Sequence, residues 1–100
     1  MTPNPVRGEA LLELGGTDVL LRPSFSALCA AEAELGPLFG LVERAAAGEL
    51  RLTEMAALFW HCSCGFAEDR DRFSEALIEG GLAGATPALK ALLTQILAGR

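Results

Sequence analysis

The stretch from Asn4 to Gly36, NPVRGEALLELGGTDVLLRPSFSALCAAEAELG, decides the fold because two hydrophobic periods meet in it. Apolar and polar residues alternate on both sides of Gly15 and Gly16, a pattern typical of two antiparallel strands. A pair of glycines can adopt the positive φ values that a tight hairpin turn requires. Immediately afterwards the apolar residues recur at helical spacing. The stretch therefore predicts a β-hairpin at about 7–22 and a helix at about 24–35.

The remainder of the chain predicts further helices. Apolar residues recur every three or four positions, and glycine, proline and capping residues separate the segments. A two-stranded ribbon is only marginally stable in water, so the helices must cover its apolar face. We therefore expect one α+β domain, 1–100, that is mostly α: an N-terminal β-hairpin followed by four or five short helices packed as a small bundle. After the first helix, the expected helices span about 37–47, 53–64, 73–79 and 86–98.

Local details are also predicted. Ser24 and Thr53 are the expected N-caps of the first and third helices, because their hydroxyls can accept hydrogen bonds from free backbone N–H groups. The charged run before the fourth helix is expected to be solvated. Glu32 falls on the apolar stripe of its helix, and a charge is rarely buried unpaired, so we expect it to pair with an arginine such as Arg22 or Arg7. A residue that contacts a partner is the second interpretation of Glu32.

Composition argues against several function classes. The chain has 100 residues, 51% of them hydrophobic, and no apolar run near the roughly 20 residues that span a bilayer. Its formal net charge of -5 argues against nucleic acid as the main partner, because phosphates are bound by Lys and Arg. The N-terminus lacks the pattern of a secretory signal, and an odd number of cysteines agrees with a reducing compartment. We expect a cytoplasmic protein with no nucleic-acid or membrane partner.

The cluster His61-Cys62-Ser63-Cys64 suggests an enzyme or a metal site, because with Cys29 it offers four zinc-type ligands. On a helix, Cys62 and Cys64 would lie about 200° apart and could not face one ion unless the helix ended there. A Cys-His nucleophile pair has no identifiable third residue to orient it, and buried cysteines are ordinary core residues. Packing is therefore the favoured role. We expect no enzyme, no cofactor and no metal, with a metal or thiol protein as the less favoured alternative.

Apolar side chains outside the hairpin are candidates for either core or partner surface. The last helix carries an apolar stripe with nothing after it in this sequence to cover it. A domain this small often completes its burial by self-association or by binding an amphipathic helix of another protein. The residues predicted to contact a partner are Phe39, Trp60, Leu89, Leu92, Leu93 and Ile96.

An extended pattern without a catalytic motif runs through most of the chain. It comprises Arg7-Gly8-Glu9, Gly15-Gly16, Leu21-Arg22-Pro23, Phe25, Ala27-Leu28, Glu32, Leu35-Gly36, the segment from Leu41 to Leu52, Glu79-Gly80-Gly81-Leu82 and Leu92-Leu93. This pattern resembles the small tail-assembly proteins of gene transfer agents and related siphophages, which are encoded between the major tail protein and the tape measure protein.

The resemblance implies a function in tail assembly. It implies a cytoplasmic chaperone, from a gene transfer agent or a prophage, that binds the long helical tape measure protein. Such a chaperone keeps its client soluble until the tail tube polymerises around it. The alternative is a minor structural component of the tail tube. The implied partners are the tape measure protein or other tail proteins, and self-association as a homo-oligomer stays open.

Overall fold

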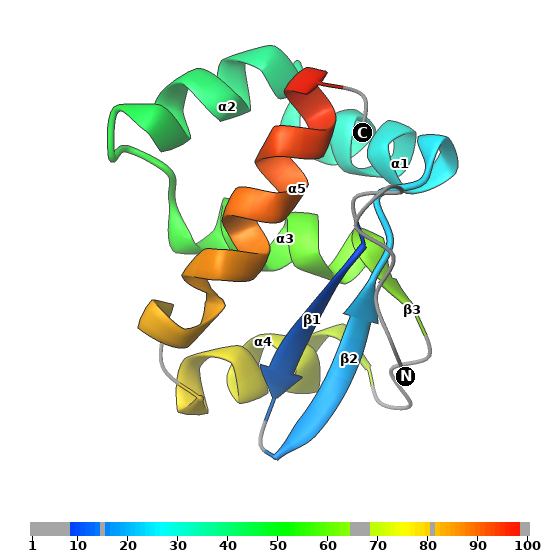
Figure 1. Cartoon of the computed structure of the whole chain (residues 1–100), viewed down its shortest axis with the longest axis vertical. Coiled ribbons are helices and arrows are strands. Elements are labelled where there is room, and N and C mark those ends of the chain that lie inside the picture. Colours follow the sequence, from blue (N-terminus) through cyan, green and yellow to red (C-terminus); the bar gives the residue numbers. More distant parts are fainter. Residues whose placement is uncertain (1–8, 15, 65–68, 81, 99–100) are drawn as a thin grey trace.

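The hairpin predicted around the double glycine is present in the computed structural model of the chain (Figure 1). Strand β1, Ala10–Leu14, pairs antiparallel with β2, Thr17–Leu21, and Leu14 lies opposite Thr17. Gly16, in the connection between them, has a φ of +84°, which residues with a side chain rarely adopt. The other turn glycine lies outside the described residues.

The structure describes residues 9–14, 16–64, 69–80 and 82–98. The predicted fold class, α+β and mostly α, is confirmed: in this part of the chain the hairpin is followed by five α-helices, a two-residue strand and a 3-10 segment. The elements after the hairpin are α1 (Phe25–Leu35), α2 (Leu38–Ala46), α3 (Leu52–Cys62), β3 (Ser63–Cys64), α4 (Arg70–Glu79), the 3-10 segment η2 (Leu82–Ala85) and α5 (Thr86–Ala98).

Strand β3 is a feature that the sequence pattern does not predict. The periodicity predicts a helix over 53–64, whereas α3 ends at Cys62. The next residue, Ser63, is extended, and its hydroxyl donates to the Trp60 carbonyl oxygen at 2.7 Å. The Arg22 N–H donates to the Cys62 carbonyl oxygen at 2.7 Å, and β3 pairs antiparallel with the end of β2. The open edge of β2 therefore ends the helix, which is a tertiary effect.

One predicted helix cap is confirmed and one is wrong. The Ser24 hydroxyl accepts a hydrogen bond from the Ala27 N–H at 3.1 Å and caps α1. Thr53 does not cap α3, because this helix begins one residue earlier. Its start is fixed instead by Glu54, whose carboxylate reaches back to accept the Arg51 N–H at 3.0 Å.

Helix α4 begins inside the charged run rather than after it. Its N-cap is Asp69, whose carboxylate accepts the Arg72 N–H at 2.9 Å. Asp71 in the first turn also favours the positive end of the helix dipole. The helix therefore starts at Arg70 and not at about 73, and the arginines of the run lie on a helix surface.

The predicted pairing of Glu32 with Arg22 is wrong. The Glu32 carboxylate accepts the N–H of Leu38, the first residue of α2, at 3.2 Å. Arg22 pairs with Glu9 instead, at 2.8 Å between Nε and Oε2. Only 5% of the Glu9 side chain is exposed, so this ion pair compensates a buried carboxylate. Arg7, the other predicted partner, lies outside the described residues.

The core lies where the hairpin meets the helices. Leu12 and Val19 face each other across the two strands, and both are buried. Helix α5 contacts β1 and α2 (Figure 1). Leu92, on the apolar stripe of this helix, is therefore fully buried. The other fully buried large side chains include Leu21, Leu41, Leu58, Phe59, Phe73 and Leu77.

Among the described residues, no single helix is long and apolar enough to cross a membrane. Helices α1 and α2 meet the length and composition criterion only as a pair, and that pair is bent by 78°.

Gly16 offers a test of the hairpin. Valine at this position would have to hold a positive φ with a branched side chain, at a cost of about 1–3 kcal/mol. We expect Gly16→Val to lower the melting temperature measured by circular dichroism. Gly16→Asn should lower it less, because asparagine tolerates this region better. Apart from Gly16 and its two chain neighbours, no described atom lies within 4 Å of the position that a Cβ would take, so backbone strain rather than a clash at Cβ would explain the loss. An unchanged melting temperature in the valine variant would contradict the assigned turn.

Candidate functional site

The six apolar residues predicted to contact a partner occupy different environments. Phe39 on α2 is 69% exposed, whereas Leu92 on α5 is fully buried. The other four are partly buried and pack against the core: Trp60, Leu89, Leu93 and Ile96. Phe39 is therefore the most accessible of the six.

Trp60 joins α3 to α4. Its ring meets that of Phe73 edge to face, with the centroids 5.5 Å apart and the planes at 74°. Phe73 is fully buried, so the pair belongs to the core. An aromatic pair of this kind contributes about 0.5–1.5 kcal/mol beyond the burial of its area.

An apolar groove of about 280 Å³ lies between α3 and α4. Leu52 and Ile78 are 41% and 49% exposed and belong to its wall. The α4 side consists of residues spaced four apart, which lie in a row on one helix face. The residues that line this α3–α4 groove are Leu52, Thr53, Ala56, Ala57, Arg70, Ser74 and Ile78.

Sequence reasoning missed this groove. The row of Arg70, Ser74 and Ile78 is visible in the sequence only if α4 starts inside the charged run. If α4 began at about residue 73, Arg70 would lie outside the helix, and the spacing of four residues along one helix face would no longer be visible. The capping aspartate, Asp69, was the signal that could have revealed it.

Three helices meet at the carboxylate of Glu34, and we call this group the Glu34 cluster. Arg70 from α4 binds both carboxylate oxygens, with 2.8 Å between Nη1 and Oε1. His61 Nε2 from α3 lies 2.8 Å from Oε1. The hydrogen bond from Arg70, and after it that from His61, lowers the pKa of the Glu34 carboxyl to about 2. Glu34 in turn raises the pKa of the Arg70 guanidinium.

The Glu34 cluster could not be predicted from the sequence either. Its members are 27 and 36 residues from Glu34 along the chain, so no local period connects them. The cluster joins α1 to α4 and holds Arg70 in the wall of the α3–α4 groove.

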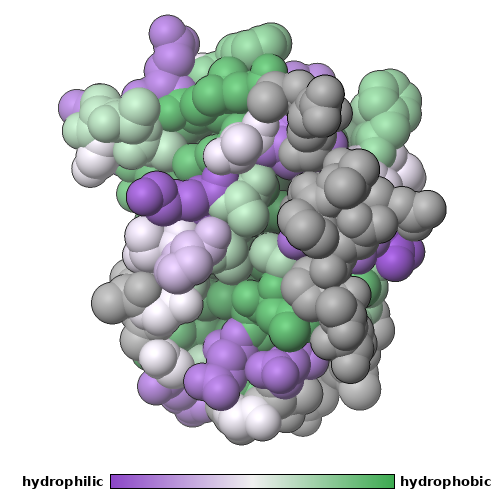
Figure 2. Space-filling model, in the orientation of Figure 1, coloured by the Kyte–Doolittle hydropathy of each residue, from purple (hydrophilic) through white to green (hydrophobic). Residues whose placement is uncertain are grey.

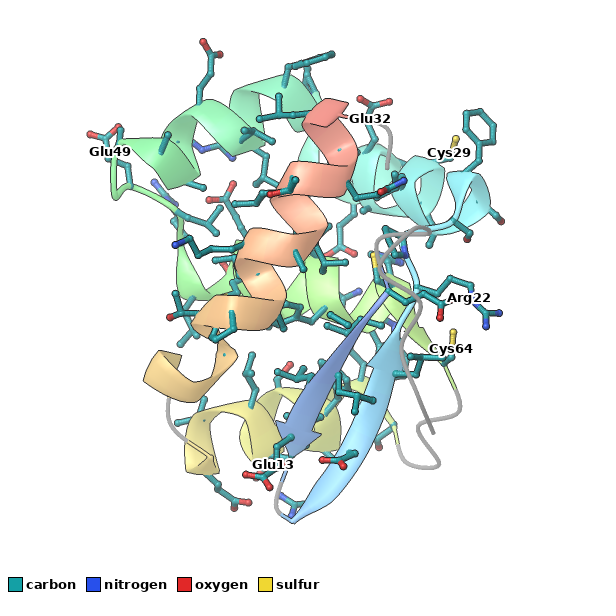
Figure 3. All side chains as sticks on the ribbon, in the orientation of Figure 1. Glu13, Arg22, Cys29, Glu32, Glu49 and Cys64 are labelled. Atoms are coloured by element: carbon teal, nitrogen blue, oxygen red, sulfur yellow. The ribbon has the colours of Figure 1, made fainter. Side chains whose placement is uncertain are left out.

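The cysteine cluster borders a second, more polar cleft of about 410 Å³ near the start of α1. Cys62 is buried, and burial raises the pKa of its thiol to about 12, so it is not a ready nucleophile. Figure 3 shows Cys29 on α1 and Cys64 on β3, far apart in that view. Within the described ranges, no three His, Cys, Asp or Glu side chains gather closely enough to hold a metal ion. The lining residues are Arg22, Ser24, Ser26, Ala27, Ala30, His61, Cys62, Ser63 and Cys64.

Large apolar side chains also reach solvent away from the groove. Phe25 on α1 is 85% exposed. Phe25 and Phe39 have the highest exposed fractions among the large apolar residues of the described chain. Figure 2 shows apolar surface over the upper end of the molecule, where α1, α2 and the end of α5 lie in Figure 1. Among the described residues, apolar side chains therefore reach solvent both at the α3–α4 groove and on α1 and α2.

A family model described as phage tail tube protein, GTA-gp10, matches residues 7–99. The chain belongs to this family. Comparisons with curated proteins and with solved structures gave no match. The resemblance found in the sequence is therefore confirmed as membership of a family of gene transfer agent and phage tail proteins.

Membership of the GTA-gp10 family supports a structural role in a phage-type tail and contacts with other tail proteins. The geometry agrees with such a role. The α3–α4 groove is lined mainly by apolar atoms, and the single histidine of the chain is hydrogen-bonded to a carboxylate that Arg70 also binds. The described residues thus offer surfaces for packing against a protein.

Glu34 gives the fold a pH dependence of defined sign. Its pKa in the folded state is about 2, below the ordinary value of 4.5. The stabilisation is therefore fully present above about pH 4.5 and is lost as the pH falls towards 2. We expect Glu34→Gln to lower the melting temperature at neutral pH and the difference from wild type to shrink over that range. The exposed Glu49→Gln is the control and should follow wild type. A difference that does not change with pH would contradict the ion-pair origin.

Proposed function

We propose that this protein is a tail assembly chaperone that holds a helical segment of the tape measure protein in the α3–α4 groove. The observation that supports the proposal is the groove itself: an open, apolar surface with Leu52 and Ile78 half exposed in its wall. A volume of about 280 Å³ suits one or two apolar side chains of an amphipathic helix.

The charge of the domain suits a chaperone of an apolar client. The exposed face of α4 carries Asp71 and Glu75 beside the row that contains Ile78. Together with the net charge of -5, these carboxylates keep a complex in solution while its apolar residues are covered. Binding would take place in the cytoplasm, before the tube forms. The proposal requires no cofactor and no catalytic residue.

A second candidate function is a structural component of the tail tube. The family description, a phage tail tube protein, favours it. In that case the protein would remain in the finished particle, and the α3–α4 groove would contact a neighbouring tail subunit. The two candidates predict different locations of the protein after assembly, so the composition of purified particles separates them.

The chaperone proposal predicts a soluble complex. We expect co-expression with the adjacent tape measure protein to give a complex that survives size-exclusion chromatography and that does not form without this protein. Ile78→Asp places a charge in the groove and should weaken binding by about tenfold or more. Leu97→Asp is the matched control, since Leu97 is 59% exposed on α5 and lies outside the groove lining.

Two results would contradict the proposal. Normal binding by a folded Ile78→Asp variant would exclude the groove as the site. Absence of a complex, with the protein found in purified particles instead, would favour the tail tube component.

A further inference from the structure

The outer face of α1 carries a row of three exposed side chains. Phe25, Cys29 and Glu32 are spaced four and three residues apart, so they lie along one side of the helix. All three are exposed, and Phe25 is 85% exposed. Figure 3 shows Cys29 on the outer side of α1.

The end of this row meets α2, which is bent by 78° from α1. The Glu32 carboxylate accepts the Leu38 N–H at 3.2 Å, which places the start of α2 at the end of the row. Phe39, the next residue, is 69% exposed. We call Phe25, Cys29, Glu32 and Phe39 the outer stripe. Helix α1 has 11 residues. At a rise of about 1.5 Å per residue, a helix lying along it could make contacts over about three turns.

The charges beside the outer stripe are negative. On α1 and α2, Glu34 is engaged by Arg70, and Arg44 by Glu54. This leaves Glu32 in the stripe and Glu43, one turn after Phe39, exposed and without an ion pair among the described residues. Two copies docked through this surface would bring carboxylates together, which is unfavourable. A helix with lysines or arginines beside its apolar side chains is complementary.

We propose that the outer stripe is a second docking surface, and that it binds a basic amphipathic helix of another protein. Phe25 and Phe39 are the apolar anchors at its two ends, and Glu32 and Glu43 pair with the flanking lysines or arginines. The aromatic anchors account for affinity, since exposed aromatic residues contribute most when a partner buries them. The carboxylates account for the choice of partner. This inference goes beyond the α3–α4 groove and does not rest on it.

Synthetic helical peptides test the surface directly. One peptide has a leucine stripe flanked by lysines, and its control has glutamates in place of the lysines. We expect the lysine peptide alone to bind, with an affinity that falls as salt is added. Phe25→Ser combined with Phe39→Ser should weaken binding by about tenfold or more. Glu32→Gln combined with Glu43→Gln should weaken it and reduce the salt dependence. The amide oxygen introduced by Glu32→Gln can still accept the Leu38 N–H, so α2 keeps this hydrogen bond.

Alkylation of Cys29 provides a second measurement, in which Phe25 and Phe39 are not mutated. In a Cys64→Ser background, Cys29 is exposed and Cys62 is buried, so alkylation reports on the outer stripe. The lysine peptide should slow this alkylation in a chain that keeps both phenylalanines. Circular dichroism should show the Phe25→Ser, Phe39→Ser variant folded, because both side chains are largely exposed.

Several outcomes would overturn the proposal. Equal binding of the lysine and glutamate peptides would contradict the pairing of Glu32 and Glu43 with basic residues of the partner. Full binding by the double serine variant, or no change in Cys29 alkylation, would place the peptide elsewhere. Loss of binding in Ile78→Asp alone would assign the peptide to the α3–α4 groove. A wild-type dimer that the serine variant dissociates would make a second copy the occupant.

Discussion

Burial of both faces of β2 is the constraint on which the rest of the structure depends. Val19 and Leu21 point to one face of the sheet and Leu20 to the other, and all three are buried. A free hairpin could not achieve this, because a two-stranded ribbon leaves at least one face in water. Helices must therefore cover the sheet, and β3 pairs with the edge of β2 away from β1, where backbone groups would otherwise lack partners. The pairing with β3 also ends α3 at Cys62, one residue after the histidine that contacts Glu34.

The parts of the fold that follow from the sequence are those set by neighbouring residues. The alternation of Leu12 and Leu14, the glycine turn and the Ser24 cap all act within a few positions. The features that could not be predicted from the sequence depend on residues far apart in the chain. The end of α3 is set by β2, and the contact of Arg70 with Glu34 spans 36 residues. The α3–α4 groove exists only when two helices pack together. Its residues form no motif of their own, and the capping Asp69 is a local signal only for the start of α4.

Ion pairs between elements organise the surface as well as the fold. Arg22 with Glu9, Arg44 with Glu54 and Arg70 with Glu34 each join different segments. Partly exposed pairs such as Arg70 with Glu34 contribute modest free energy individually, so their effect here is also positional, whereas the pair of Arg22 compensates the buried Glu9. Arg70 illustrates this effect, because the guanidinium that lines the groove is held by α1, the helix that carries the outer stripe. The ion pair between Arg70 and Glu34 therefore connects the wall of the α3–α4 groove to the helix that carries most of the outer stripe.

The same pairing leaves negative charge beside the exposed apolar side chains of this small domain. Arginines that are engaged by carboxylates contribute no free positive charge, so the excess charge of -5 is carried by exposed carboxylates such as Glu43 and Glu75. Two copies that met through Phe25, Phe39 or Ile78 would bring these carboxylates close together, at an electrostatic cost. A partner helix with neutral or basic flanks avoids that cost and still covers the apolar side chains. Contact between two copies through these side chains is thus electrostatically less favourable than contact with a partner that has neutral or basic flanks.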